Sequence, residues 1–260
     1  MATEATERMK VLVTGAKGFV GSFLCPGLEA AGYEVVPYDL KDGQDIFNGE
    51  QLSEALAGCD AVVHMAAIPH YSPTIPPQEY IRLNVYGTEE VLWAADYAGI
   101  RQFVYISSGA LYGFGTGRMD GWTEPTICTD ERPESADWDS IDIYGASKLL
   151  AEDIIDDFTQ PFETAVEWLE TNIPVAEELL MNCVSLRLNC IEPHHEGAKD
   201  QGHHWGWWCS QELITNTVNA ALGYDGHEGQ FTRVNVAEPN ENMGLTDLYG
   251  LLGGVVCATT

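Results

Sequence analysis

Tyr144 and Lys148 are the first candidates for chemistry, because both side chains are ionisable and they stand four residues apart. Residues 143–158 have helical periodicity, so this spacing places the pair on one face of a helix. A nearby ammonium favours a phenolate, so Lys148 is expected to lower the pKa of Tyr144 and make it an acid or base near neutral pH. Ser107 and Ser108 end a predicted strand, where a hydroxyl can bind a reacting oxygen. The alternative is a chance pair on an exposed helix.

A glycine-rich loop at residues 14–21 is the second candidate, because it follows a predicted strand and opens a predicted helix. Gly15 permits a tight turn, Gly18 lets the backbone approach a pyrophosphate, and Gly21 allows close packing of the helix. The helix N-terminus offers N–H donors and partial positive charge to phosphates. This setting predicts a dinucleotide site rather than a turn without function. The residues of the loop predicted to bind the dinucleotide are Gly15, Lys17, Gly18, Phe19, Val20 and Gly21.

Asp39 ends the second predicted strand, 18 residues after Gly21. A carboxylate there accepts hydrogen bonds from a ribose diol and repels a 2′-phosphate, which favours NAD over NADP. Lys17 and Lys41 favour NADP instead, since either ammonium could reach a 2′-phosphate. An ordinary turn residue at the end of a strand is the remaining interpretation of Asp39.

The elements that must position these groups alternate along the chain. Strands are predicted at 10–14, 33–38, 61–65, 102–107, 183–190 and 231–236, and helices at 19–31, 51–57, 77–98, 143–158 and 246–252. Alternating strands and helices predict an α/β fold, a Rossmann-type doubly wound parallel sheet covered on both faces. A long loop is expected at 113–138, an acidic insertion at 159–182, and irregular chain at 191–208.

Three regions are expected along the chain. Residues 1–9 form a polar N-terminal tail, residues 10–190 the dinucleotide-binding domain, and residues 191–260 a small substrate-binding lobe. The strand near 231–236 could rejoin the sheet of the larger domain.

Further motifs give the chain its resemblance to a known family. Residues 14–21 match a TGxxGxxG loop, 64–67 an HxAA strand end, 84–88 an NxxGT segment, and 107–113 an SSxxxYG segment. In this order they resemble the extended short-chain dehydrogenases/reductases, which include sugar epimerases, dehydratases and sugar dehydrogenases. The resemblance covers about residues 10–193. It implies that NAD is bound additionally by Asp45, Ile46, Met65, Ala66, Ala67 and Asn84, and by Tyr144 and Lys148, and that Ser108, Tyr144 and Lys148 are catalytic.

The chain departs from the family pattern in places that bear on the substrate. Gly109 and Ala110 stand where dehydratases carry Asp-Glu and uronate dehydrogenases carry Asn-His, which argues against dehydration. Residues 208–210 nevertheless resemble the Trp-x-Ser segment of uronate dehydrogenases. The run 186–193 resembles LRxxNxxGP but is one residue shorter, so the substrate contact of Asn189 stays open. The substrate candidates are Ser107, Ser108, Gly109, Asn189 and Trp208.

The resemblance implies hydride transfer between a secondary alcohol of a sugar or nucleotide-sugar and NAD. The 67 residues that follow Pro193 are few for a lobe that encloses a nucleotide-sugar, which favours a sugar dehydrogenase acting on a smaller sugar or sugar acid. A UDP-sugar 4-epimerase that retains NAD is the first alternative, and a non-catalytic NAD-sensing regulator is the second. The family also implies a homodimer in which the helices at 77–98 and 143–158 pair across the interface.

The charge balance excludes two classes of partner. Forty acidic residues stand against 12 basic ones, five of them lysines, and the formal net charge is −28. Such a surface repels nucleic acid and anionic membranes. It resembles proteins from salt-loving organisms, in which molar salt shortens the Debye length to about 3 Å and screens self-repulsion. We therefore expect that the chain needs high salt to stay folded, and that NAD binding tightens as salt rises.

The remaining sequence features favour a cytoplasmic protein with no metal. No apolar run approaches the roughly 20 residues of a membrane span, and the N-terminus has no signal-peptide pattern. Seven irregularly spaced cysteines form neither a disulfide framework nor a zinc ribbon. A cluster in the irregular region could bind zinc, but a substrate-facing or surface loop is the alternative. The cluster consists of His194, His195, His203, His204 and Cys209.

Overall fold

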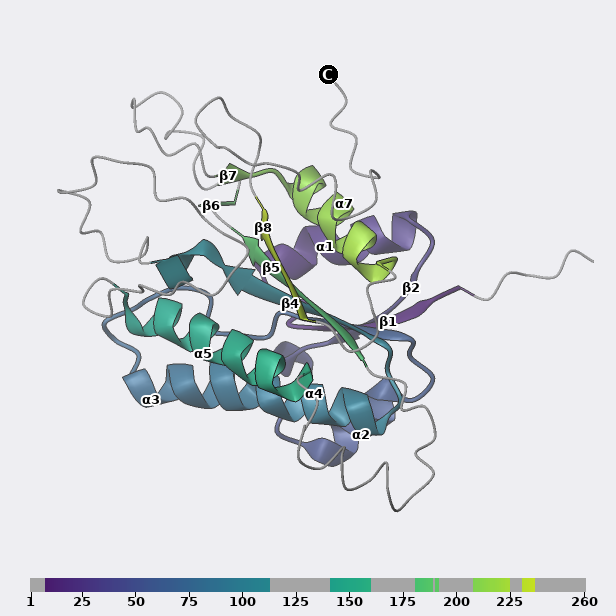
Figure 1. Ribbon diagram of the computed structural model, residues 1–260. Coiled ribbons are helices and arrows are strands. Elements are labelled where there is room, and N and C mark those ends of the chain that lie inside the picture. Colours follow the sequence, from purple (N-terminus) through teal and green to yellow (C-terminus); the bar gives the residue numbers. More distant parts are fainter. Residues whose placement is uncertain are drawn as a thin grey trace, which may run out of the picture.

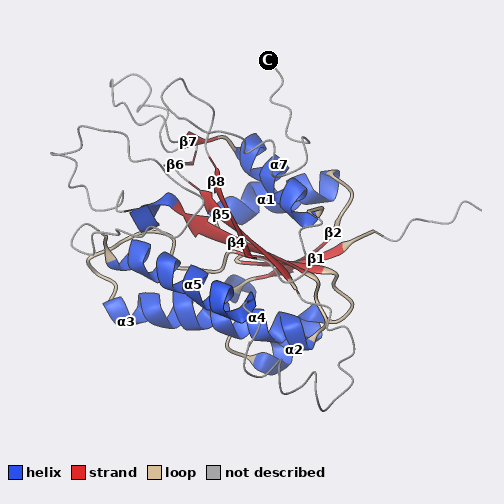
Figure 2. Ribbon diagram, viewed as in Figure 1, coloured by secondary structure: helices blue, strands red, loops and turns tan. Residues whose placement is uncertain are grey.

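The computed structural model describes residues 8–112, 141–159, 181–188, 190–191, 208–224 and 231–236. Its centre is a six-stranded, fully parallel sheet in the order β2-β1-β3-β4-β5-β8, with helices on both faces (Figures 1 and 2). The strands are β1 (Lys10–Thr14), β2 (Glu34–Tyr38), β3 (Ala61–His64), β4 (Gln102–Ser108), β5 (Asn182–Leu188) and β8 (Phe231–Val236). The predicted α/β class is confirmed.

The helices form one layer on each face of the sheet. The helical elements are α1 (Phe19–Ala30), α2 (Gly49–Leu56), α3 (Pro77–Tyr80), a π-helical segment (Ile81–Tyr86), α4 (Gly87–Tyr97), α5 (Ile143–Thr159), α7 (Gln211–Leu222), and short 3-10 helices at Leu40–Asp42 and Gly109–Tyr112. Helices α1 and α7 pack together on one face, and α2, α4 and α5 lie on the other (Figure 1). A separate two-residue pairing joins β6 (Cys190–Ile191) to β7 (Trp208–Cys209).

The sheet is buried on both faces, which explains why its strands are nearly continuous apolar runs. Successive side chains of β1 alternate between the two layers. Val11 and Val13 pack with Leu24 and Leu28 of α1, whereas Leu12 packs into the layer that contains α2 and α4.

The strand order fixes where a ligand can bind. From β1 the chain passes to β2 on one side and then returns to β3 on the other side. The connections therefore diverge between β1 and β3, and a crevice opens at the carboxyl ends of these two strands. Open α/β sheets bind their ligands at such a point.

The predicted helix at 77–98 is one continuous helical stretch, but its middle turn, Ile81–Tyr86, is π-helical. π-Helical turns occur frequently at functional sites. This one places Asn84 at its buried side, where the amide reaches the loop after β3.

Helix α7 is an element that the sequence analysis did not predict. Ser210 caps it, because its hydroxyl accepts a hydrogen bond from the backbone N–H of Leu213 at 3.0 Å. Ile214, Val218 and Leu222 recur at helical spacing and are buried. Helix α7 packs against α1, and β8 then extends the sheet beside β5. The proposed division at residue 191 stays a prediction, since most of 191–260 lies outside the described residues, as does the helix predicted at 246–252.

Among the described residues, no helix is both long and apolar enough to cross a membrane.

Candidate dinucleotide and catalytic site

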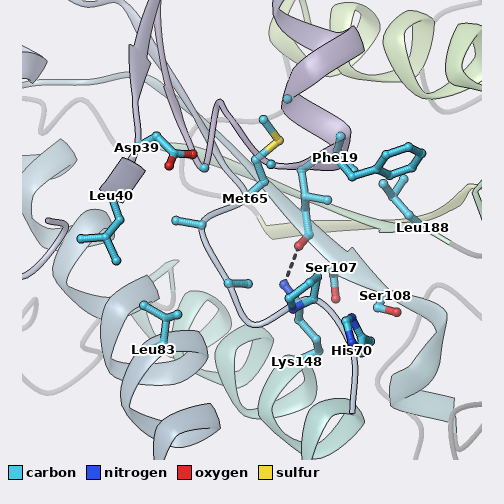
Figure 3. Close-up of a pocket in the computed structure, with 18 of the residues that line it drawn as sticks. Phe19, Asp39, Leu40, Met65, His70, Leu83, Ser107, Ser108, Lys148 and Leu188 are labelled. Atoms are coloured by element: carbon cyan, nitrogen blue, oxygen red, sulfur yellow. Dashed lines mark hydrogen bonds between the residues drawn. The ribbon is translucent and has the colours of Figure 1, made fainter. Parts of the chain in front are cut away.

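A large cavity, with a volume of about 1250 Å³, opens at the carboxyl ends of the central strands. Figure 3 shows Asp39 at one end of it, and Ser107, Ser108 and Lys148 at the other. The predicted site residues that line it are Gly15, Gly18, Phe19, Val20, Gly21, Asp39, Asp45, Ile46, Met65, Ala66, Ala67, Ser107, Ser108, Gly109, Tyr144 and Lys148. One cavity therefore joins the predicted dinucleotide loop to the predicted catalytic residues.

The glycine loop exposes its backbone to the cavity, because its glycines carry no side chain. Gly15 has a φ of 70°, and a Cβ there would lie 2.9 Å from the backbone nitrogen of Ala66. Gly18 is the N-cap of α1 and has no side-chain cap, so the first N–H groups of the helix keep their donors for a ligand. A Cβ on Gly21 would overlap the backbone of Ala16, so the tight packing predicted for Gly21 is against the loop itself.

A buried hydrogen-bond chain supports this loop from below. The hydroxyl of Thr14 accepts from the backbone N–H groups of Met65 and Ala66, each at 3.2 Å. Its own proton therefore goes to Nδ1 of His64 at 2.7 Å, and Nε2 of His64 donates to Thr88 at 3.1 Å. Burial lowers the pKa of His64 to about 3, so its ring is neutral. These hydrogen bonds fix the distance between the loop after β1 and the loop after β3.

The carboxylate of Asp39 is held by one backbone N–H of the glycine loop and one of the turn after β2. It accepts from the N–H groups of Lys17 and Lys41, each at 2.8 Å. The ammonium of Lys41 donates to the carbonyl of Lys17 at 2.7 Å, and the ammonium of Lys17 pairs with Asp42. Both ammonium groups thus join the glycine loop to the turn after β2. The carboxylate of Asp39 keeps its place at the cavity wall, where the predicted ribose contact would form.

Asp45 and Ile46 line the same end of the cavity. The carbonyl of Asp45 accepts a hydrogen bond from the hydroxyl of Tyr38 at 2.8 Å, which ties this turn to β2. Ile46 is buried, and a Cβ on Gly87 would lie 2.6 Å from its Cδ1. Close approach of α4 therefore fixes the position of Ile46.

Asn84 does not line the cavity, although it was predicted to bind the dinucleotide. Its amide donates to the carbonyl of Ile68 at 3.2 Å and contacts the hydroxyl of Ser147 at 2.9 Å, and its oxygen accepts from the N–H of Ile68 at 2.8 Å. It therefore joins the loop after β3 to α5. Lys17 is likewise absent from the cavity wall, because its ammonium is drawn to Asp42.

Tyr144 stands at the start of α5, next to the end of β4. Gly145 makes this possible, since a Cβ there would overlap the carbonyl oxygen of Ala110. The predicted direction of the pKa shift of Tyr144 is wrong: burial raises this pKa, a hydrogen bond with Ser108 acts against burial, and Asp142 raises it further. Tyr144 is therefore a neutral phenol that shares a hydrogen bond with Ser108.

The ammonium of Lys148 is turned toward β4. It donates to the carbonyl of Ile106 at 2.8 Å, a hydrogen bond drawn in Figure 3. It also lies 4.7 Å from the ring centre of Tyr105. Burial lowers the pKa of Lys148 to about 7, and Glu152 acts in the opposite direction. Near neutral pH this lysine can therefore exchange its proton.

Several cavity residues were not predicted, and two predicted ones cannot be placed. His70 lies beside Ser108 in Figure 3, and its carbonyl accepts from the buried Tyr80 hydroxyl at 3.0 Å. A polar residue soon after a strand end was the signal available for His70. The other unpredicted residues of the wall are Tyr38, Leu40, Lys41, Gln44, Pro69, Leu83, Ile106, Ala110, Leu188 and Ile191. Asn189 and the side chain of Trp208 lie outside the described residues.

The four histidines of the possible zinc cluster also lie outside the described ranges. The thiol of Cys209 donates to the carbonyl of Val236 at 2.8 Å, inside the core. Within the part of the chain that the structure describes, no group of three or more His, Cys, Asp or Glu side chains could hold a metal ion.

The cavity fits a nicotinamide dinucleotide in three respects. Gly15 and Gly18 form a cradle that a Cβ would partly fill, and Asp39 is placed for a ribose. The hydroxyl of Ser107 is buried at the wall and has no hydrogen-bond partner among the described residues. A buried hydroxyl is normally satisfied, so this one is consistent with a polar ligand group at the catalytic end.

A family model described as "NAD dependent epimerase/dehydratase family" matches residues 11–183, which is most of the chain. The match includes the glycine loop, the end of β4 and the Tyr144–Lys148 pair. The chain therefore belongs to this family, and NAD is its cofactor. Membership confirms the resemblance to extended short-chain dehydrogenases/reductases.

Individual relatives share parts of the chain. It is 31% identical over 170 residues to a 3-beta-hydroxysteroid dehydrogenase from Mycolicibacterium neoaurum, and 32% identical over 164 residues to a UDP-glucose 4-epimerase from Rhizobium meliloti (strain 1021). These alignments cover 59% and 57% of the chain. They span only 44% and 46% of the two relatives.

Two solved structures share the fold. A mutated uronate dehydrogenase superposes with a TM-score of 0.69 at 21% identity. The match covers 96% of this chain and 82% of the uronate dehydrogenase chain. MoeE5, solved with UDP-glucuronic acid and NAD, superposes with a TM-score of 0.65 at 22% identity. The match covers 89% of this chain and 77% of the MoeE5 chain.

Proposed function

We propose that the chain is an NAD-dependent sugar dehydrogenase, which transfers hydride between a secondary alcohol of a sugar or sugar acid and NAD. The observation that carries this proposal is the joining of Ser108, Tyr144 and Lys148 to the glycine loop in one cavity. A group of donors with an acid–base tyrosine, placed in the same cavity as a dinucleotide cradle, suits oxidation of an alcohol.

Each residue has a distinct part in the proposed reaction. The loop of Gly15, Gly18 and Gly21 and the N-terminus of α1 hold the pyrophosphate, and Asp39 holds the adenosine ribose. The bound nicotinamide supplies the hydride acceptor or donor. Ser108 positions the substrate oxygen through its hydroxyl.

Tyr144 first releases its phenolic proton to solvent, and as a phenolate it then takes the proton of the substrate hydroxyl. Lys148 receives the ribose of the nicotinamide and stabilises the negative charge of this phenolate. The raised pKa of Tyr144 keeps the phenol protonated before substrate binds. The ammonium of Lys148 must then act on Tyr144 in the loaded site, because in this structure it is bonded to the carbonyl of Ile106.

The substrate class is supported by the names of related proteins. Solved neighbours include uronate dehydrogenase and a protein bound to UDP-glucuronic acid, and curated relatives include UDP-glucose 4-epimerases. An NAD-retaining UDP-sugar 4-epimerase is the alternative that these relatives favour.

An absorbance assay at the NADH band tests the proposal. The protein is mixed with NAD and a panel of free sugars, sugar acids and UDP-sugars. Steady accumulation of NADH with a free sugar or sugar acid is the expected result. Interconversion of UDP-sugar isomers without free NADH would identify an epimerase instead, and tight NAD binding without either reaction would identify an NAD-sensing regulator.

We also propose that the chain forms a homodimer through α4 and α5. Tyr86, Trp93 and Tyr97 recur at spacings of seven and four residues, so they share one face of the π–α4 helix. All three are exposed, Tyr97 to 88%. Trp93 packs edge-on against Phe158 of α5 with ring centres 5.0 Å apart, which makes one apolar surface of the two helices.

The Trp93→Glu/Tyr97→Glu variant is expected to be a monomer at micromolar concentration, because two carboxylates cannot be buried in an apolar interface without partners. Sedimentation velocity of both proteins at low and molar salt measures this. The acidic surface should weaken the wild-type dimer at low salt. A Met9→Glu variant, changed at an exposed apolar residue of another surface, should stay dimeric; a wild-type monomer under all conditions would contradict the proposal.

A further inference from the structure

A buried network of charges continues from Lys148 along α5, away from the cavity. Tyr144, Lys148 and Glu152 follow one another at four-residue spacing, so they share one face of the helix. Glu152 is only 1% exposed, although burying a carboxylate is costly without partners. The reaction proposed above gives Glu152 no role.

The carboxylate of Glu152 is clamped by β5. Its Oε1 accepts from the hydroxyl of Ser185 at 2.8 Å and from Nε of Arg187 at 3.0 Å, and its Oε2 accepts from Nη2 of Arg187 at 2.7 Å. Arg187 is fully buried. Nε of Arg233 on β8 lies 3.6 Å from Oε2, and Arg233 also pairs with Asp156 at 2.7 Å. These contacts fix Glu152 in one position.

The groups facing Lys148 come from three neighbouring elements and from α5 itself. Tyr105 of β4 presents its ring to the ammonium, and His64 of β3 stacks on that ring with centres 5.9 Å apart. Both are uncharged, because burial raises the pKa of Tyr105 and lowers that of His64 to about 3. Tyr144 is a neutral phenol in the free protein, and Arg187 on β5 is a cation. Among the residues that the structure describes, the negative charge that acts on Lys148 is that of Glu152.

We propose that Glu152 is a positioning residue for Lys148: its clamped carboxylate is the counter-charge that keeps the buried ammonium protonated at the base of the cavity. This inference rests on the proposed function, since it assigns Lys148 a part in that reaction. The protonation of Lys148 can nevertheless be measured without turnover.

A purely structural ion pair is the competing account of Glu152, and it predicts loss of stability alone. The positioning role predicts in addition a change in the titration of Lys148. Lys148 is protonated below its pKa of about 7 and loses its proton as the pH rises. Removing the charge of Glu152 removes an interaction that raises this pKa, so the titration should move to lower pH.

The test uses NMR of the whole chain with isotope-labelled lysine. The chain has only five lysines, and the Lys148 signal is the one missing in Lys148→Met. In Glu152→Gln the titration midpoint of Lys148 should fall by about one pH unit, a tenfold change in the ratio of protonated to free amine. The alkaline limb of kcat/KM should move to lower pH by a similar amount.

Asp156→Asn is the matched control. Asp156 is also a carboxylate of α5 in the same network, but its side chain is 34% exposed, and it bonds Arg233 eight residues along α5 from Lys148. Its loss should leave the Lys148 midpoint within about 0.3 units of wild type. An unchanged midpoint in Glu152→Gln, or an equal shift in Asp156→Asn, would overturn the inference.

If Glu152→Gln does not fold, Arg187→Met tests the same inference through a shift of the Lys148 midpoint in the opposite direction. It removes a cation and leaves Glu152 with Arg233, so the Lys148 midpoint should rise; no rise would count against the inference. If the midpoints shift as expected while no sugar reduces NAD, the proposed function fails and the counter-charge role of Glu152 stands. If sugars are oxidised while the midpoints stay fixed, only this inference fails.

Discussion

Tyr144→Phe is expected to lower kcat by about 10³-fold, because general acid–base groups contribute roughly 10²–10⁴ to a rate. The substitution removes one oxygen and keeps the ring that packs at the start of α5. That oxygen shares a hydrogen bond with Ser108 and lines the cavity where the substrate oxygen would lie. The dinucleotide loop is untouched, so the Kd for NAD should stay within about threefold, which is below 1 kcal/mol.

Turnover is measured by NADH absorbance and NAD affinity by titration of the intrinsic tryptophan fluorescence. Tyr33→Phe is the matched control, since it removes the same atom from a tyrosine that bonds Asn219 of α7 and does not line the cavity. Its kcat should equal that of wild type. Full activity of Tyr144→Phe would remove Tyr144 from the mechanism, and an equal loss in both variants would indicate a general effect on the fold.

At the catalytic end of the cavity, the sequence predicts where Tyr144 and Lys148 lie but not the direction in which the pKa of Tyr144 shifts. A spacing of four residues suffices to place Tyr144 and Lys148 on one face, because helix geometry is local. The pKa of Tyr144 depends on burial by chain segments distant in sequence, and no spacing reports burial. The expectation that an adjacent ammonium dominates is therefore wrong for the free protein.

At the dinucleotide end too, the sequence predicts the local backbone but not the partners of the side chains. The turn at Gly15 could be predicted, since its φ of 70° is one that glycine adopts freely. The engagement of Lys17 could not, because it depends on Asp42 in the turn after β2. Asn84 carries a family motif, yet its amide is used to join Ile68 to α5. A motif fixes which residue is present but not which partner it binds.

The fold was predictable where the apolar pattern was unambiguous. Buried parallel strands such as β1 and β3 are short apolar runs, and each lies close to its predicted bounds. Helix α7 was missed, although Ser210 and the spacing of Ile214, Val218 and Leu222 mark its start and its buried face. Residues 194–208, which precede it, are rich in His, Gly and Trp and have no apolar periodicity that leads into the helix.

Gly21→Val is the second change with a large expected effect. A Cβ at this position would overlap the carbonyl oxygen of Ala16 and lie 2.5 Å from its carbonyl carbon. Neither atom can move without moving the loop backbone between β1 and α1. Overpacking of this kind costs about 1–3 kcal/mol in stability and occasionally more. A strain of about 3 kcal/mol that falls on the NAD-binding form of the loop weakens NAD binding by about 100-fold.

Gly49→Val separates this effect from the general cost of a β-branched residue in a helix. Gly49 begins α2, and no atom lies within 4 Å of a Cβ built on it. Its free energy of unfolding should change by no more than about 0.7 kcal/mol, and its Kd for NAD should not change. Calorimetric titration with NAD and chemical denaturation of both variants decide the matter. If Gly21→Val bound NAD as tightly as Gly49→Val, the loop between β1 and α1 would not be the pyrophosphate cradle, because a backbone displaced by Ala16 could not keep its donors in place.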